Sequence, residues 1–209
     1  FKNCNIFYFD RLNPASVELA RRYWENGAIV IFEPSSIGDE NLFNKALKTS
    51  HIIKFSADRI KSYLKNYPTP QGLIEIQTEG VEGLIYRSSL LDQEGWTRLN
   101  AKNVPYELIK DTSGAGDWCT AGIIDRLGRR STTQFLQLDR QTLEEALNYG
   151  QSLSAISCFF EGARGAMYSL DSERVKTAAD NSSDLTSLQF QETSDHRIFF
   201  ESSDICTLI

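Results

Sequence analysis

Residues 110–117 read Lys-Asp-Thr-Ser-Gly-Ala-Gly-Asp, a polar turn that contains two glycines. The run 104–109 before this turn has the apolar character of a strand, and the run 118–124 after it has the character of a helix. A strand, a turn of small residues and a helix in succession are how an α/β protein presents the amides of a helix N-terminus to an anion. The sequence therefore predicts an anion-binding turn within an α/β fold.

The same turn places a carboxylate beside its expected anion hole. Gly114 and Gly116 allow the backbone to approach a ligand closely, because they carry no Cβ atom. Asp117 falls in the first turn of the expected helix, where the helix dipole favours a negative charge. This combination suits phosphoryl transfer to an alcohol, in which catalysis consists mainly of positioning and charge stabilisation.

Short strands and helices alternate along the rest of the chain. Strands are expected at 5–10, 28–32, 50–55, 72–77 and 84–87, with an edge strand at 95–99. Helices are expected after Pro14, after Asp39 or Glu40, across 56–67 and across 142–160. Because the links between these elements are short, we expect a mostly parallel sheet covered by helices. Ligands of such sheets lie beyond the carboxyl ends of the strands.

Composition and charge exclude several classes of function. The chain carries a net charge of −6 and no basic patch beyond Arg129 and Arg130, so we expect no nucleic-acid partner. It contains no long apolar run and no signal peptide, so we expect no membrane partner. Its four cysteines form no C-x-x-C pair, which favours a cytoplasmic location. Walker-type and dehydrogenase glycine motifs are missing from the sequence.

Residues 111–117 match all six specified positions of the D-T-x-G-A-G-D signature of the PfkB family of carbohydrate kinases. Residues 78–83 resemble the T-x-G-x-x-G turn of that family, and residues 30–35 resemble its strand that ends in an acid and a proline. Residues 162–166 resemble its glycine-rich nucleotide loop. Over residues 1–168 the chain thus resembles the C-terminal portion of a PfkB kinase. This implies a three-layer, ribokinase-like (Rossmann-like) α/β fold that lacks the family's N-terminal strands and lid.

The resemblance implies ATP-dependent transfer of the γ-phosphoryl group to a hydroxyl of a sugar or sugar-like molecule. By position in the motif, Asp117 would be the catalytic base. Gly114, Ala115 and Gly116 would supply the amides of the anion hole. Asp117 need not be a strong base, because the hydroxyl proton leaves late in a loose transition state.

The resemblance also implies where ATP and cations bind. Nucleotide contacts are expected at Thr78, Gly80, Gly83, Ala163, Arg164 and Gly165. A monovalent cation, K⁺, would lie near Asp111 and Ser113, and Glu33 is a candidate for Mg²⁺.

One segment departs from the family pattern. Where the family has N-x-x-E, which helps to order Mg²⁺, residues 56–59 read Ser-Ala-Asp-Arg. Either Mg²⁺ is held another way, through Glu33 and the nucleotide phosphates, or the site is weakened. The sequence therefore leaves open a nucleotide-binding, catalytically weakened regulatory relative. A different α/β class, such as a flavodoxin-like binding module, is a third alternative.

The remaining expectations concern the extent of the chain, its C-terminal segment and two single residues. It begins with Phe1 and its only methionine is Met167, so we expect a piece of a longer protein that is inactive alone. A sugar site, and a homodimer formed through the lid, would then depend on the missing part. Residues 169–209 are expected to form an extension, with a hairpin or a partly disordered tail. Lys54 is interpreted as a surface charge and His51 as structural.

Overall fold

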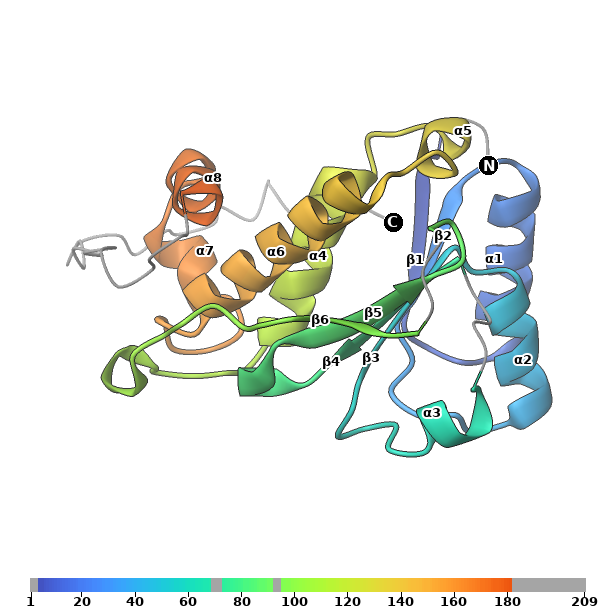
Figure 1. The fold of residues 1–209 in the computed structure, drawn as a ribbon, viewed down its shortest axis with the longest axis horizontal. Coiled ribbons are helices and arrows are strands. Elements are labelled where there is room, and N and C mark those ends of the chain that lie inside the picture. The colour runs from blue at the N-terminus through green and yellow to red at the C-terminus, as the bar shows by residue number, and fades with distance from the viewer. Residues whose placement is uncertain (1–3, 69–72, 92–94, 182–209) are drawn as a thin grey trace, which may run out of the picture.

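The computed structural model describes residues 4–68, 73–91 and 95–181, which form a three-layer α/β structure (Figure 1). One six-stranded sheet has the order β1-β2-β3-β4-β5-β6. Its first four strands pair in parallel, and the last two are antiparallel. The strands are β1 (Ile6–Phe9), β2 (Ile29–Phe32), β3 (Ile52–Ser56), β4 (Ile74–Thr78), β5 (Leu84–Ser88) and β6 (Thr97–Leu99). The predicted, mostly parallel sheet is thus confirmed.

Helices cover both faces of this sheet (Figure 1). On one face lie α1 (Pro14–Glu25), α2 (Glu40–Lys48) and α3 (Tyr63–Asn66). On the other face lie α4 (Ala115–Leu127), α5 (Thr132–Phe135) and α6 (Arg140–Ser157). Successive strand residues point to opposite faces, so Ile29 and Ile31 pack against the second set while Val30 and Phe32 pack against the first. This explains why β2 is apolar throughout.

Two further helices, α7 (Gly165–Ser169) and α8 (Ser172–Asp180), pack against α6. Val175, Ala178 and Ala179 of α8 are buried in a cluster with Tyr149 and Ile156 of α6. The hairpin expected between 188 and 201 lies outside the described residues. No helix of the described part of the chain has the length and apolar character that a membrane span requires.

Side-chain caps account for several of the helix starts, including that of α8, which lies in a segment expected to form a tail. The side chains of Asn13, Asp39, Asp139 and Asp171 each accept a hydrogen bond from an amide in the first turn of the following helix. Such caps satisfy amides that have no partner within the helix.

Two expected elements are wrong, and proline or turn geometry explains each. Residues 104–109 form no strand but contain the 3₁₀ helix η2 (Tyr106–Leu108). Pro105 precedes this turn and has no amide to donate to a sheet, and Tyr106 is 88% exposed. The helix expected across 56–67 is only the single turn α3, because residues 57–59 form a turn.

A third difference concerns residues 129–139, where no helix was expected from the sequence. They contain α5, which begins with a capping box at Ser131. Phe135 of α5 is fully buried, with its ring edge-on to His51. The His51 ring also accepts a hydrogen bond from the Val30 amide at 3.0 Å, and this agrees with the structural role expected for it.

The helices α4 and α6 approach each other through two glycines. A Cβ atom on Gly122 would lie 2.8 Å from the Gly150 Cα atom, so any larger residue must push the helices apart. We expect Gly122→Ala to lower the free energy of unfolding by about 1–3 kcal/mol, the usual cost of overpacking. Urea unfolding followed by circular dichroism tests this, with Ala121→Ser on the exposed side of α4 as the control. Equal midpoints for both variants would contradict the close contact.

Candidate active site

The carboxyl ends of the parallel strands place several predicted residues along one edge of the sheet. Glu33 directly follows β2, and Thr78 ends β4 beside Ser56 of β3. Helix α4 begins at the same edge, because the Gly116 carbonyl accepts a hydrogen bond from Nζ of Lys54 on β3 at 3.2 Å. The topology therefore gathers segments more than 60 residues apart in sequence, as expected for a ligand site of an open α/β sheet.

The turn before α4 leaves the start of the helix without a side-chain cap. Gly114 is the N-cap residue with a φ of +77°. The Ala115 amide donates to the Thr112 carbonyl at 3.2 Å. The amides that follow it, of Gly116 and Asp117, lie in the first turn, where a helix offers donors to a ligand. Asp117 itself is exposed.

A second loop lies directly against this turn. A Cβ atom on Gly114 would lie 2.7 Å from that of Ala163, so only glycine allows this approach. Trp118 Nε1 donates a hydrogen bond to the Ala163 carbonyl at 2.9 Å. Asp111 accepts one hydrogen bond from the Ser113 amide at 2.8 Å and another from the Gly162 amide at 2.9 Å. The two segments that resemble family motifs are thus adjacent.

The hydrogen bonds that the Asp111 carboxylate accepts should depend on pH, because they are lost when the carboxylate is protonated. Hydrogen bonds from Ser113 and from the Gly162 amide lower the pKa of Asp111 below its usual value. A carboxylate whose pKa is depressed on folding contributes stability above its unfolded pKa, about 3.9 for aspartate, and loses it as the pH falls through the folded pKa. We expect the Gly162 amide resonance in NMR spectra to stay constant from neutral pH down to about 4. A transition centred above that pH would contradict the assignment.

The structure places a buried ion pair at this edge that the sequence interpretation missed. Lys54, expected on the surface, is only 2% exposed. Its Nζ atom lies 2.6 Å from Oε1 of Glu33, and Thr120 Oγ1 of α4 donates to the other carboxylate oxygen at 2.6 Å. Burial of a lysine requires such a partner. The Lys54–Glu33 pair therefore joins β2 and β3 to the first turns of α4, close to Asp117.

Tyr8 is a second residue that the sequence interpretation missed. Its hydroxyl donates to Glu33 Oε2 at 3.3 Å. Burial is the main cause that raises the pKa of Tyr8, and the negative charges of Glu33, Asp10 and Asp117 add to it. Tyr8 therefore keeps its proton at neutral pH and lies near the carboxylate of Asp117. Its place at the end of the strand-like run 5–10 was the available signal.

The remaining residues that were predicted to contact the nucleotide lie in two segments, around the end of β4 and around the start of α7. Thr78 and Gly80 lie at the carboxyl end of β4, where Gly80 begins the 3₁₀ helix η1 (Gly80–Glu82). Gly83 and Gly165 have a packing reason to be glycine. A Cβ atom on Gly83 would lie 2.2 Å from the Leu99 carbonyl oxygen, and one on Gly165 would lie 2.7 Å from Phe160 Cβ. Arg164 is exposed on the loop that contacts Gly114.

Metal ligands are not gathered at this edge. Within the described ranges, no three His, Cys, Asp or Glu side chains cluster as metal ligands would. Glu33 already neutralises Lys54, and both of its oxygens have protein partners. The carboxylate does not resemble a preformed Mg²⁺ ligand, which needs free oxygen atoms.

Comparisons with known proteins identify the fold. No family model matches the sequence, and no curated protein does. Solved structures match, including the aminoimidazole riboside kinase from Salmonella enterica, complexed with aminoimidazole riboside and an ATP analog. It has a TM-score of 0.64 and 24% identity, over 83% of this chain and 62% of that chain.

Two further solved structures have different substrates in their names. The fructokinase from Vibrio cholerae, bound to fructose, ADP and a calcium ion, has a TM-score of 0.65 and 17% identity, over 86% of this chain and 62% of that chain. The ribokinase from Thermotoga maritima has a TM-score of 0.63 and 18% identity, over 85% of this chain and 57% of that chain. The chain thus has the ribokinase-like fold and spans less than two thirds of each of these structures.

Proposed function

We propose that this chain is the nucleotide-binding portion of an ATP-dependent kinase, which transfers the γ-phosphoryl group to a hydroxyl of a sugar or sugar-like small molecule. The observation that carries the proposal is the Gly114–Asp117 turn at the start of α4, beside the carboxyl ends of β2, β3 and β4. Solved kinases of the same fold support it.

In this proposal Asp117 accepts the proton of the acceptor hydroxyl. Its exposed carboxylate lies in the first turn of α4, where a substrate can reach it. The amides of Gly116 and Asp117, with the close approach that Gly114 allows, stabilise negative charge that develops on the transferred group, whereas the Ala115 amide, also expected to contribute, is bonded to the Thr112 carbonyl. The buried Lys54–Glu33 pair has no contact with a reacting atom in this scheme. Its hydrogen bonds to Gly116 and Thr120 fix the position of the start of α4 relative to the sheet.

We assign the nucleotide to the two glycine-containing loops. Its phosphates would lie along Thr78, Gly80 and Gly83, and its adenine would be bordered by Ala163, Arg164 and Gly165. The contacts of Asp111 and Trp118 with residues 162–163 support a shared nucleotide site, because they hold the second loop against the anion hole.

We assign K⁺ and Mg²⁺ to different parts of this edge of the sheet. A K⁺ ion would be held near Asp111 and Ser113, where the Asp111 carboxylate already orders both loops. The ion pair with Lys54 makes Glu33 a poor direct ligand of Mg²⁺, so in this proposal Glu33 would act through water. A cytoplasmic location is consistent with the free thiols of Cys4, Cys119 and Cys158.

A nucleotide-binding relative with weakened catalysis is the alternative. It is favoured by residues 56–59, where Asp58 and Arg59 are exposed in a turn that follows β3. No acid is held there in the place of the glutamate of N-x-x-E.

Activity of the full-length natural protein separates these functions. ATP binding with Mg²⁺, measured by calorimetry, is combined with ADP release in the presence of a panel of sugars and ribosides. Turnover of any acceptor supports the kinase. Nucleotide binding without turnover supports the weakened relative, and absence of nucleotide binding contradicts both.

A further inference from the structure

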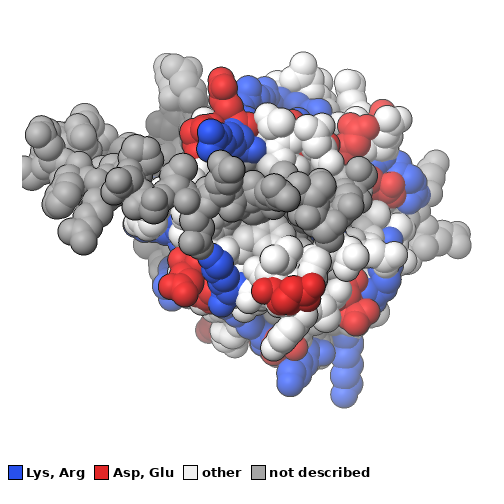
Figure 2. Space-filling view, turned by 90° about the vertical axis from the view of Figure 1, so that its left-hand side faces the viewer, with Lys and Arg blue, Asp and Glu red and all other residues white. Residues whose placement is uncertain are grey.

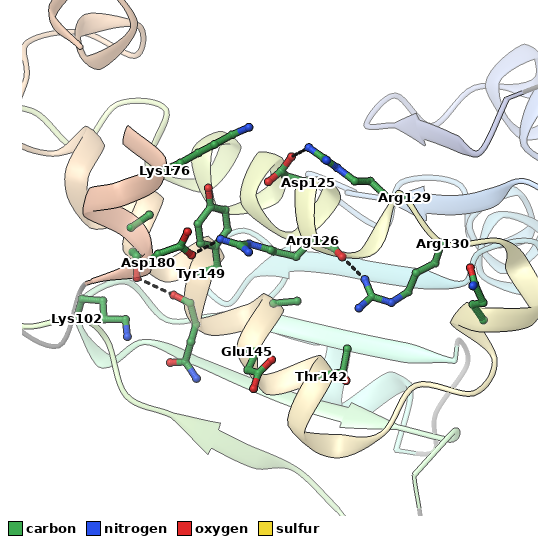
Figure 3. Close-up of a pocket in the computed structure, with 15 residues that line it drawn as sticks. Lys102, Asp125, Arg126, Arg129, Arg130, Thr142, Glu145, Tyr149, Lys176 and Asp180 are labelled. Atoms are coloured by element: carbon green, nitrogen blue, oxygen red, sulfur yellow. Dashed lines mark hydrogen bonds and ion pairs between the residues drawn. The ribbon is translucent and has the colours of Figure 1, made fainter. Parts of the chain in front are cut away.

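A cavity of about 1090 Å³ lies away from the candidate active site, between helices α4, α5, α6 and α8 (Figure 3). Its size is slightly above the usual range for small-molecule sites, roughly 300–1,000 Å³. Arg126 and Arg130 line it from the C-terminal end of α4 and the residues just after it, Tyr149 from α6, and Lys176 from α8. Asp117 lies at the opposite end of α4, so this cavity is a separate feature.

Positive charge is concentrated in this cavity, although the whole chain has a net charge of −6. Five basic and three acidic side chains line it, which leaves a local net charge of +2: Lys102, Arg126, Arg129, Arg130, Lys176, Asp125, Glu145 and Asp180. On the face of the molecule that carries α7 and α8, acidic and basic side chains are interspersed (Figure 2). The cavity is therefore a local positive site on an acidic protein.

Three of the basic residues have protein partners that hold them in place, and one of them, Arg130, donates a hydrogen bond to the Arg126 carbonyl. Arg126 forms an ion pair with Asp180 and lies over the ring of Tyr149, 3.7 Å from its centroid. Arg129 forms an ion pair with Asp125 at 3.1 Å. The buried Nε atom of Arg126 has no hydrogen-bond partner among the described residues. Arg126 thus contributes a guanidinium that Asp180 and Tyr149 hold in place at the wall of the cavity.

Lys102 and Lys176 have no acidic partner within the part of the chain that the structure describes. Burial lowers the pKa of Lys102, as expected for an ammonium group that lacks a compensating charge. Basic residues near the end of α4 could simply offset its dipole. That explanation does not cover Lys102, which precedes α4 in the chain, or Lys176 on α8.

We infer that this cavity binds a small polyphosphate anion, a ligand with two or more phosphate groups. Lys102 and Lys176 provide charges that no acidic side chain of the described residues pairs with, and they lie on opposite sides of Arg126 and Tyr149 (Figure 3). Arginine and lysine side chains that converge on a concave surface are the usual recognition groups for phosphate. The inference concerns a second site and does not depend on the proposed kinase activity.

Titration of the full-length protein with inorganic pyrophosphate tests the inference. Calorimetry at low salt measures the dissociation constant, and amide NMR spectra locate the ligand. The Lys102→Gln/Lys176→Gln variant removes two of the unpaired charges without breaking an ion pair of the described residues. We expect it to weaken binding by on the order of tenfold or more per charge lost.

The matched control is Lys45→Gln/Lys48→Gln, which removes two exposed lysines of α2 on the opposite face of the sheet. Binding that weakens only in the cavity variant, with shifts at Tyr149 and Ala179, supports the inference. Absence of binding overturns it. So does equal binding by both variants, or a set of shifts confined to the turn of Gly114 to Asp117.

Discussion

Replacement of Asp117 by Asn in the full-length protein should lower kcat by about 10²–10⁴-fold, the usual effect of losing one general acid–base group. The affinity for ATP should change little, because the backbone amides of the anion hole remain. The carboxylate is exposed in the first turn of α4, so the substitution disturbs no buried contact. Steady-state kinetics on the acceptor with the highest activity, together with ATP calorimetry, measure both quantities.

Glu107→Gln provides the control for this prediction. Glu107 lies in the exposed turn η2 shortly before the anion hole, and it has no assigned role. Its substitution should leave kcat unchanged. If Asp117→Asn retains the rate of the unaltered protein, Asp117 is not the base, and the proposed mechanism fails.

Replacement of Lys54 by Met should lower the free energy of unfolding by about 3 kcal/mol. Removing one partner of a buried ion pair leaves the other charge uncompensated, at a cost of about 3–5 kcal/mol. The lower value applies because the Glu33 side chain remains 18% exposed. The variant also loses the hydrogen bond to the Gly116 carbonyl, so the start of α4 should become less well positioned.

Two further variants separate lost charge pairing from lost packing. The double variant Lys54→Met/Glu33→Gln neutralises both partners and should recover much of the stability. Lys45→Met on the exposed surface of α2 should change stability by no more than about 0.5 kcal/mol. Urea unfolding measures all of them. A midpoint for Lys54→Met equal to that of the surface control would show that the pair contributes nothing.

Much of the fold could be predicted because it depends on local pattern. Continuous apolar runs such as 28–32 indicate strands covered on both faces, and caps such as Asn13 and Asp39 mark helix starts. The turn before α4 could also be predicted, because two glycines beside an acid serve few purposes other than close approach of a ligand. The contact between Gly114 and Ala163 gives a different reason for glycine at position 114, which is the close packing of two loops.

The features that the sequence did not reveal depend on contacts between distant residues. Lys54 is buried because β2 lies next to β3 and α4 begins at the same edge, which brings Glu33 and Gly116 to its ammonium group. No local pattern around Lys54 contains that information. Residues 104–109 show the opposite error, in which local apolar character suggested a strand although Pro105 prevents regular pairing.

The central claim is that the start of α4 binds the phosphates of ATP. Amide NMR spectra of isotope-labelled full-length protein, titrated with ATP and Mg²⁺, test it most directly. We expect the resonances of Gly114, Gly116 and Asp117 to shift together with that of Gly80. Shifts confined to residues of the α4–α8 cavity, or no shifts at a saturating ATP concentration, would contradict it.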